Sequence, residues 1–221
     1  MTGKKYKDII QIINEFLFIN SLVRGDKMAR IADPEKMDSI KKAVMECVID
    51  YGYAGVSTSL ICEKAGVSPG YLYRYYKSKE ELVQELVDSE MQSIIKNFIS
   101  DIDSSSTLYE AGYKTIKKLF MRANLEPMVA RFAASVVMDL KMPAEGKLDG
   151  FKSVLELAEK CIKLSEKTGE TNSDITPLEV LIISFTIPFR YLSFSLELDK
   201  NKIFTEEEVK RIAQICINAL K

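Results

Sequence analysis

Hydrophobic residues recur every three or four positions along most of the chain. This spacing places apolar side chains on one face of a helix. No stretch alternates apolar and polar residues between Asn-Gly or Asp-Gly turns, as a hairpin does. The pattern therefore predicts an all-α protein, with helices over 34–51, 58–65, 69–75, 79–99, 107–123, 127–141, 147–168, 177–197 and 205–220.

Helix start signals support these boundaries. Asp33-Pro34 places a cap residue before a proline at the first helical position. Gly52 is expected to end the first helix. Capping-box spacing, in which a Ser or Thr is followed three residues later by Glu, occurs at Ser78 and Glu81, Thr107 and Glu110, Thr176 and Glu179, and Thr205 and Glu208.

The composition changes near residue 80. Before that point, short predicted helices carry Lys, Arg and Tyr, and after it longer helices carry Leu, Ile, Met and Phe. We expect an N-terminal extension at 1–32, a small module at 33–80, and a larger helical body at 81–221 that is joined to the module through a long helix.

Composition and charge exclude several function classes. The 221-residue chain has a net charge of −1, so any positive surface for nucleic acid must be local. It has no histidine, which removes the commonest general base and the usual zinc ligand. We expect no metal site, no cofactor and no enzyme activity. The four cysteines lie far apart among apolar residues, which predicts buried, reduced thiols in a cytoplasmic protein.

Residues 178–198 are apolar enough to suggest a membrane span. Pro188 and Arg190 lie in the middle of this run, together with several serines. A charged side chain is costly at the centre of a bilayer. We therefore expect a helix buried between other helices and no membrane partner.

Residues 57–76 have the spacing of a helix-turn-helix. Such a unit needs a small residue where the helices cross, a glycine in the turn and an apolar residue on the second helix facing the first. Cys62, Gly66 and Leu72 meet these needs in that order. Ser68 can cap the second helix and Pro69 can begin it.

The second helix contains tyrosines at four of six consecutive positions. At 100° per residue, Leu72 and Tyr76 face inward, whereas Tyr71, Arg74 and Tyr75 face outward. A tyrosine offers a flat apolar ring to sugar or thymine methyl and a hydroxyl to phosphate. We expect DNA contacts from Ser57, Ser68, Pro69, Gly70, Tyr71, Tyr73, Arg74, Tyr75, Lys77 and Lys79, with Lys79 at a helix N-terminus suited to phosphate. The alternative is a tyrosine-rich core helix, although one core face cannot hold all four rings.

Residues 34–86 resemble the DNA-binding signature of the tetracycline-repressor (TetR) family of bacterial regulators. The matching positions are Gly52-Tyr53, Ile61, Ala65-Gly66-Val67-Ser68, Gly70, Leu72-Tyr73, Tyr75 and Ser78-Lys79-Glu80-Glu81-Leu82. Three positions depart from the usual residues: Val56 replaces threonine, Cys62 replaces alanine and Tyr76 replaces phenylalanine. Tyr76 leaves a hydroxyl to satisfy near a core.

The resemblance implies a homodimeric, all-helical regulator that binds double-stranded DNA at a palindromic operator. It also implies that the body dimerises through the two last long helices, about 177–197 and 205–220, and binds a small-molecule effector that releases DNA by tilting the connecting helix. Most such proteins are repressors. The alternatives are a helical scaffold or ligand-binding protein that has lost operator binding, and a small helical enzyme. No glycine-rich phosphate loop or metal-spaced cluster supports the enzyme.

The effector pocket is expected between the predicted helices 107–123 and 127–141. These carry methionines and aromatic residues with arginines that could orient an anionic effector. Ordinary core packing explains the same residues equally well. The candidates are Tyr109, Tyr113, Phe120, Met121, Arg122, Met128, Arg131, Phe132, Met138 and Arg190.

Translation could start at Met28. Fourteen of the 26 residues at 2–27 are Ile, Lys, Asn, Phe or Tyr, the residues that AT-rich codons encode. The four residues before Met28 can be encoded by AGA GGA GAT AAA, which contains a ribosome-binding GGAG. Residues 1–27 would then be translated leader. The alternative is a genuine helix, because Ile9, Ile12, Ile13, Phe16 and Ile19 share a face at helical spacing.

Overall fold

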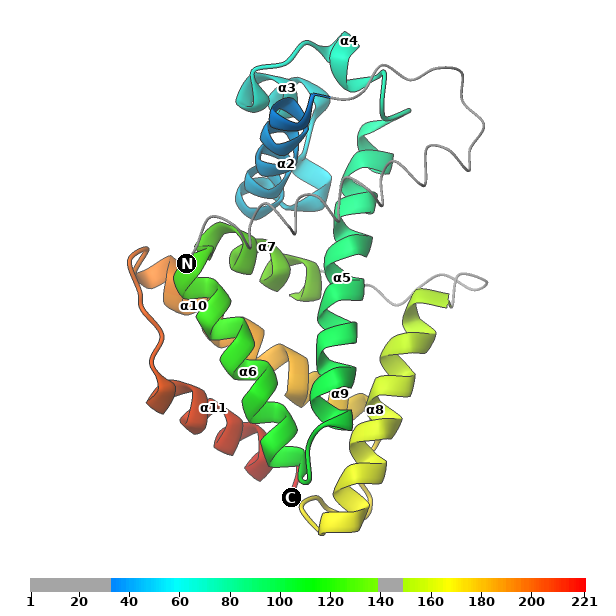
Figure 1. Cartoon of the computed structure of the whole chain (residues 1–221), viewed down its shortest axis with the longest axis vertical. Helices are drawn as coiled ribbons and strands as arrows, with labels where there is room; N and C mark the ends of the chain where they lie inside the picture. The colour runs from blue at the N-terminus through cyan, green and yellow to red at the C-terminus, as the bar shows by residue number, and fades with distance from the viewer. Residues whose placement is uncertain (1–32, 139–148) are drawn as a thin grey trace. The chain divides into compact units, whose positions relative to one another are not determined.

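The computed structural model describes residues 33–138 and 149–221, and every regular element in these ranges is helical (Figure 1). The all-α prediction is confirmed. In chain order the helices are α2 (Pro34–Gly55), α3 (Thr58–Ala65), α4 (Pro69–Leu72), α5 (Lys79–Asp103), α6 (Leu108–Leu125), α7 (Pro127–Met138), α8 (Asp149–Thr168), α9 (Pro177–Leu181), the π-helix η1 (Ile182–Thr186), α10 (Ile187–Leu198) and α11 (Glu206–Ala219). The predicted extension 1–32, and with it the possible start at Met28, lies outside the described residues.

The chain forms two compact units, Met1–Asp38 and Ser39–Lys221. The described part of the first unit is the start of α2. There the Asp33 carboxylate accepts a hydrogen bond from the Glu35 N–H at 3.1 Å, and Pro34 begins the helix. This confirms the predicted start. The predicted boundary near residue 80 falls in the second unit, at the first turn of α5, and stays a prediction.

Helix α2 is interrupted at Gly52, where the first helix was expected to end. Its φ of 67° and ψ of 169° lie outside the helical region, and three further helical residues follow. A positive φ is open to glycine at little cost. The prediction therefore gave the right position for the break.

Hydroxyl caps begin most of the later helices. The side chains of Ser57, Ser68, Ser78, Thr107, Thr176 and Thr205 each accept a hydrogen bond from a backbone N–H three residues later. Complete capping boxes form at Thr176 and Thr205. At the other two predicted boxes, the glutamate accepts instead from the residue before the cap: Glu81 from the Lys77 N–H at 2.6 Å and Glu110 from the Ser106 N–H at 2.8 Å.

The predicted helix 69–75 is shorter in the structure, because α4 ends at Leu72. The chain nevertheless continues to wind. The N–H groups of Tyr75 and Tyr76 both donate to the Leu72 carbonyl, each at 3.1 Å. Leu72 and Tyr76 are consequently both buried, as the helical rotation predicted.

The predicted single helix 177–197 is also divided. Pro188 has no N–H, and its ring would clash with the carbonyl four residues earlier in a regular helix. The wider π-turn of η1 lies just before it. Helix α10 packs mainly on α7, α9 mainly on α8, and α11 mainly on α6. Both η1 and α10 also contact α11, and the predicted dimerisation through these helices stays a prediction.

Several apolar side chains of α9, η1 and α10 are exposed, which differs from the expected burial. Leu178, Ile182, Phe194 and Leu198 are all about half exposed or more, with Leu198 at 89%. By length and composition alone, Pro177–Leu198 is the one described segment that could cross a membrane. Core helices of soluble proteins have the same length and composition.

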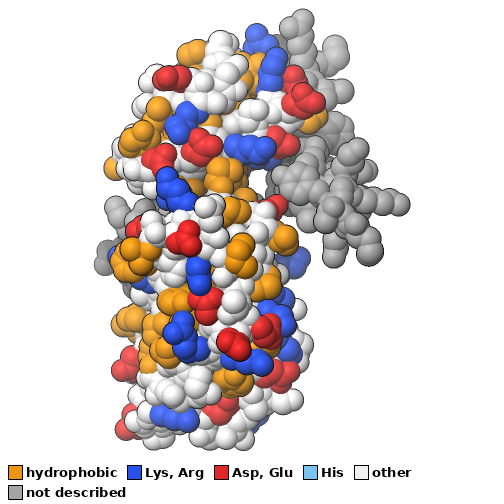
Figure 2. Space-filling model, turned by 90° about the vertical axis from the view of Figure 1, so that its left-hand side faces the viewer, with side chains coloured by type: hydrophobic (Ala, Val, Ile, Leu, Met, Phe, Trp, Pro, Cys, Tyr) orange, Lys and Arg blue, Asp and Glu red, His pale blue; other side chains and the backbone are white. Residues whose placement is uncertain are grey.

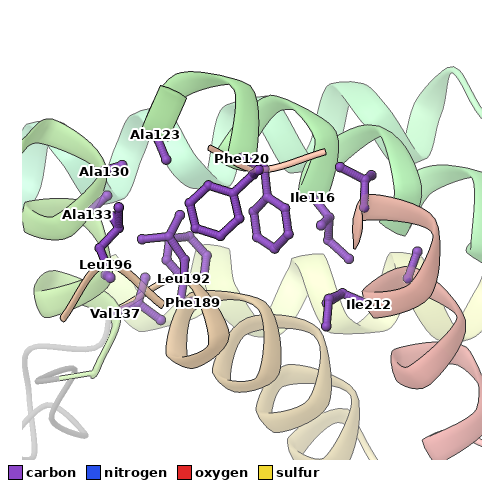
Figure 3. Packing of buried hydrophobic residues seen from close by; sticks show 14 of the residues in the cluster. Ile116, Phe120, Ala123, Ala130, Ala133, Val137, Phe189, Leu192, Leu196 and Ile212 are labelled. Carbon is purple, nitrogen blue, oxygen red and sulfur yellow. The ribbon is translucent and has the colours of Figure 1, made fainter. Parts of the chain in front are cut away.

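Two hydrophobic clusters form the core of the body. The first joins α6, α7, α10 and α11, and the second joins α5, α6, α8, α9 and α11. Figure 3 shows Phe120 of α6 lying close to Phe189 and Leu192 of α10 in the first cluster. All four cysteines are buried and unbonded, as predicted, and burial raises the pKa of Cys161 and of Cys216 to about 12.

Candidate DNA-binding surface and effector pocket

Helices α3 and α4 form the predicted helix-turn-helix. Gly66 ends α3 in the left-handed conformation, with φ of 66°, and the following Val67 N–H donates to the Cys62 carbonyl at 3.0 Å. Cys62 and Leu72 are both buried. The three residues that the motif requires therefore occupy their expected places.

The ten candidate DNA-contacting residues all have accessible surface. Tyr71, Tyr75 and Lys79 are half-buried, and the other seven are exposed. The rings of Tyr71 and Tyr75 lie 5.2 Å apart and tilted, so they form one aromatic surface. Tyr73 is 53% exposed, and its hydroxyl lies 3.3 Å from that of Thr58. Their role in DNA contact stays a prediction.

Tyr76 fits the core despite its hydroxyl. It is 6% exposed, and burial raises the pKa of its phenol. No buried side-chain nitrogen or oxygen among the described residues lacks a hydrogen-bond partner. The Tyr76 hydroxyl is therefore not a buried group without a hydrogen-bond partner.

Lys79 has a structural contact that the sequence did not reveal. Its Nζ donates to the Val56 carbonyl at 2.8 Å and lies 3.4 Å from Glu80 Oε1. Its side chain remains 24% exposed, and an ammonium group has three N–H donors. Lys79 can thus tie the start of α5 to the segment before α3 and still reach a phosphate.

The positive charge of this region is local. Residues 33–80 contain seven Lys or Arg and seven Asp or Glu, and so carry no net charge. Between Lys64 and Lys79, however, there are four basic residues and no acidic one. Thr58, which the sequence reasoning missed, joins this stretch through its contact with Tyr73. The run of three hydroxyl residues at 57–59 was the available indication.

The residues predicted to form the effector pocket lie in different environments. Phe120 and Phe132 are fully buried, and Tyr109, Tyr113, Met121 and Met138 pack against the first core cluster. Arg190 is exposed, with its guanidinium 4.5 Å from the centre of the Phe194 ring. Met128 and Arg131 are half-buried. Ordinary packing accounts for most of this set, and its role in effector binding stays a prediction.

Arg122 is neutralised by a carboxylate. Its two terminal nitrogens donate to Glu90 of α5 at 2.6 and 3.2 Å. Asp101, also on α5 and 3% exposed, accepts from Thr115 at 2.9 Å and pairs with Lys118. Because a buried carboxylate is costly without its partners, these contacts fix α5 to α6 at two points. Cross-helix pairs of this kind have no signature in the sequence.

A cavity of about 30 Å³, here called the α6–α11 cavity, lies between α5, α6, η1 and α11. It has room for one or two water molecules. Of the predicted pocket residues, Tyr109 alone lines it. The other lining residues are Phe98, Leu108, Gly112, Thr115, Ile116, Ser184, Ala213, Cys216, Ile217 and Leu220. Gly112, a glycine inside a predicted helix, was the one indication of this site in the sequence.

Comparison with known proteins finds relatives of the region that contains the helix-turn-helix. Residues 40–86 match the family model described as bacterial regulatory proteins, tetR family. The fatty acid metabolism regulator protein of Bacillus subtilis (strain 168) is 33% identical over 87 residues, covering 39% of this chain and 44% of that protein. The transcriptional regulator UidR of Escherichia coli (strain K12) is 30% identical over 78 residues, covering 35% and 39%. The chain thus matches less than half the length of these relatives.

Solved structures share the fold over most of the chain. A TetR family transcription regulator from Marinobacter aquaeolei VT8 aligns with a TM-score of 0.65 and 18% identity, over 84% of this chain and 95% of that one. FadR from Bacillus subtilis, solved in complex with stearoyl-CoA, aligns with a TM-score of 0.62 and 18% identity, over 84% and 100%. At this identity the likeness concerns the fold. Residues 40–86 thus match the tetR family of bacterial regulatory proteins, and most of the chain shares the fold of solved regulators of that family.

Proposed function

We propose that the protein is a cytoplasmic transcriptional regulator that binds a palindromic operator as a homodimer and is released by a small-molecule effector. The observation that carries this proposal is the helix-turn-helix, whose outer face presents Tyr71, Arg74, Tyr75 and Lys79 beside a capped helix N-terminus. Repression is the mode we expect. A helical protein without operator binding is the alternative that the first experiment tests.

The dimer is supported by exposed apolar side chains on the last long helices. Ile182 on η1, Phe194 on α10 and Ile215 on α11 are each about half exposed. In Figure 2 hydrophobic side chains gather in several patches between charged ones on the face shown. Covering them with a second copy gives a two-fold assembly that matches a palindromic operator. Light scattering at micromolar concentration should then give twice the 25.0 kDa chain mass.

The effector class that we propose is a long-chain acyl-CoA. Support comes from the relative that regulates fatty acid metabolism and from the neighbour solved with stearoyl-CoA. The core of this chain is compatible with an apolar ligand, because both clusters of the body consist of aliphatic and aromatic side chains. Stearoyl-CoA should release the protein from its operator, whereas free coenzyme A should not.

Footprinting the purified protein on the DNA upstream of its own gene tests operator binding. Affinity is then measured over a range of salt concentrations. Arg74 is exposed, so Arg74→Gln should weaken binding to all sequences and lower the salt slope by about 1. The control is Lys163→Gln, the same loss of charge at an exposed position of α8. Equal slopes for Arg74→Gln and the wild type would contradict the proposed docking face.

A further inference from the structure

We propose that the α6–α11 cavity receives the end of an unbranched alkyl or acyl chain, with the charged head group of the effector remaining outside. This inference rests on the proposed function and assigns its effector site. It moves the site from the α6–α7 residues that the sequence suggested to the junction of α5, α6, η1 and α11. Three features of the cavity support it, in addition to the space itself.

The first feature is Gly112, in the interior of α6. Glycine is unfavourable inside a helix because it loses more backbone freedom than alanine does. A Cβ placed on Gly112 meets no atom of a neighbouring element within 4 Å, and the residue has no positive φ. Neither packing nor backbone geometry requires a glycine here. The missing side chain instead keeps space open on the wall of the cavity.

The second feature is the π-helix η1, which places Ser184 on the opposite wall. Single π-turns within α-helices are frequent at functional sites. The hydroxyl groups of Ser184 and Tyr109 form no hydrogen bond to any of the described residues. The thiol of Cys216, another lining residue, donates weakly to the Ile183 carbonyl of η1 at 3.8 Å. The few polar groups in the walls are therefore uncharged, and most of the lining is apolar.

The third feature is the absence of charge. No Lys, Arg, Asp or Glu is among the residues that line the cavity. The nearby Asp101 is occupied by Thr115 and Lys118, and Arg122 by Glu90. Burying an anionic head group here would leave its charge unpaired. Because the space is only about 30 Å³, a slender chain fits it better than a ring system.

The cavity must widen to hold such a chain, and its position allows this. Ile116, Ala213 and Cys216 belong to the first core cluster, whereas Phe98, Leu108 and Ile217 belong to the second. A chain that enters between the clusters separates them without dismantling either. The wall also includes Thr115, whose hydroxyl holds Asp101 of α5. Occupation of the cavity can thus act on the helix that continues into the DNA-binding region.

The test compares variants that fill the cavity with a matched control. Binding of stearoyl-CoA is measured by calorimetry and by the shift in melting temperature, and operator release by fluorescence anisotropy. Gly112→Leu should weaken stearoyl-CoA binding at least tenfold, and Gly112→Ala by a smaller factor. Ser195→Ala, a half-buried serine of α10 outside the cavity, should leave it unchanged. Operator affinity without effector should be the same in all variants.

The outcomes separate this inference from the proposed function. If Gly112→Leu binds stearoyl-CoA as tightly as the wild type does, the effector site lies elsewhere and the inference is wrong. If the wild type binds its operator but no acyl-CoA of any chain length, the inference also fails while DNA binding stands. Loss of operator binding by the wild type would overturn the proposed function itself. If Gly112→Leu does not fold, Gly112→Ala supplies the same comparison, since its methyl group has space.

Discussion

Two glycines distinguish the helix-turn-helix from the body. Gly66 ends α3 with a φ of 66°, a conformation that glycine adopts readily and other residues rarely do. Gly112 lies in the regular interior of α6, where its conformation suits any residue and its neighbours leave room for a side chain. The backbone requires the first glycine, whereas nothing in the fold requires the second.

The difference between these glycines extends to the two regions. In the helix-turn-helix, the conformation is specified by residues close together in the chain: Ser57, Ser68 and Ser78 cap their helices, and Gly66 makes the turn. In the body, contacts between distant residues decide the packing, as when Glu90 pairs with Arg122. Local signals therefore account for the helix-turn-helix, whereas the body, whose helices are also capped locally, depends in addition on contacts between distant residues.

The largest expected effect on stability comes from a substitution that disrupts the packing of the body. Phe120 is fully buried, and its ring centre lies 4.6 Å from that of Phe204, with the rings tilted, and 5.8 Å from that of Tyr191, with the rings stacked. Phe120→Ala should lower the free energy of unfolding by about 3–5 kcal/mol, since it removes a large side chain and leaves a cavity. Urea denaturation measures this. A loss below about 1 kcal/mol would show that the body can collapse around the gap, and the claim that specific packing stabilises the body would be wrong.

The second-largest expected effect on stability comes from the charge of Glu208, which is also in the body. Burial acts to raise the pKa of Glu208, but hydrogen bonds from Lys202, the Thr205 backbone and Tyr191 outweigh it and hold the pKa at about 2. A carboxyl whose pKa is lowered by folding contributes stability above its unfolded pKa, and this is lost as pH falls through the folded pKa. The contribution at neutral pH is up to about 3 kcal/mol.

Glu208→Gln tests this contribution. The variant should be less stable than the wild type at pH 7, and the difference should shrink between about pH 5 and pH 2, where wild-type Glu208 takes up its proton. Melting temperatures across this range give the comparison. Glu207→Gln, an exposed neighbour on the same helix, is the control and should show no such pH dependence of its difference from the wild type. A constant difference for Glu208→Gln across the range would contradict the assignment.

Gly66→Ala tests how far the helix-turn-helix depends on the local backbone conformation of its turn. A left-handed conformation costs a residue with a Cβ about 1–2 kcal/mol. The variant should be destabilised by that amount, with no steric contribution, because a Cβ there meets nothing within 4 Å. Chemical denaturation followed by circular dichroism measures the loss. An unchanged midpoint would mean that the turn can re-form with a different geometry, and the helix-turn-helix would then depend less on local rules.

The difference between local signals and long-range packing also explains which features of the structure could be predicted from the sequence. The α3–α4 unit and its outward-facing residues could be predicted from helix caps, one glycine and helical rotation, all of which act within a few residues of the chain. The division of 177–197 at η1 did not, although Pro188 was noted, because sequence does not say how a helix absorbs a proline. The cavity could not be predicted either. It depends on where Ser184, Ala213 and Gly112 meet, and these come from three different helices.

The smallest expected effect on stability is that of Gly112→Ala, and it tests the comparison of the two glycines most directly. Gly112→Ala should raise the free energy of unfolding by about 0.5–1 kcal/mol, because alanine favours the helix and its methyl group has space. Gly66→Ala is the matched substitution with the opposite sign. If Gly112→Ala instead destabilises the protein, the glycine serves the packing of α6, and one of the three arguments for the effector site is lost. If Gly112→Ala stabilises the protein while weakening stearoyl-CoA binding, the glycine lowers the stability of α6 but is needed for ligand binding. That trade is what distinguishes a binding site from an imperfection of packing.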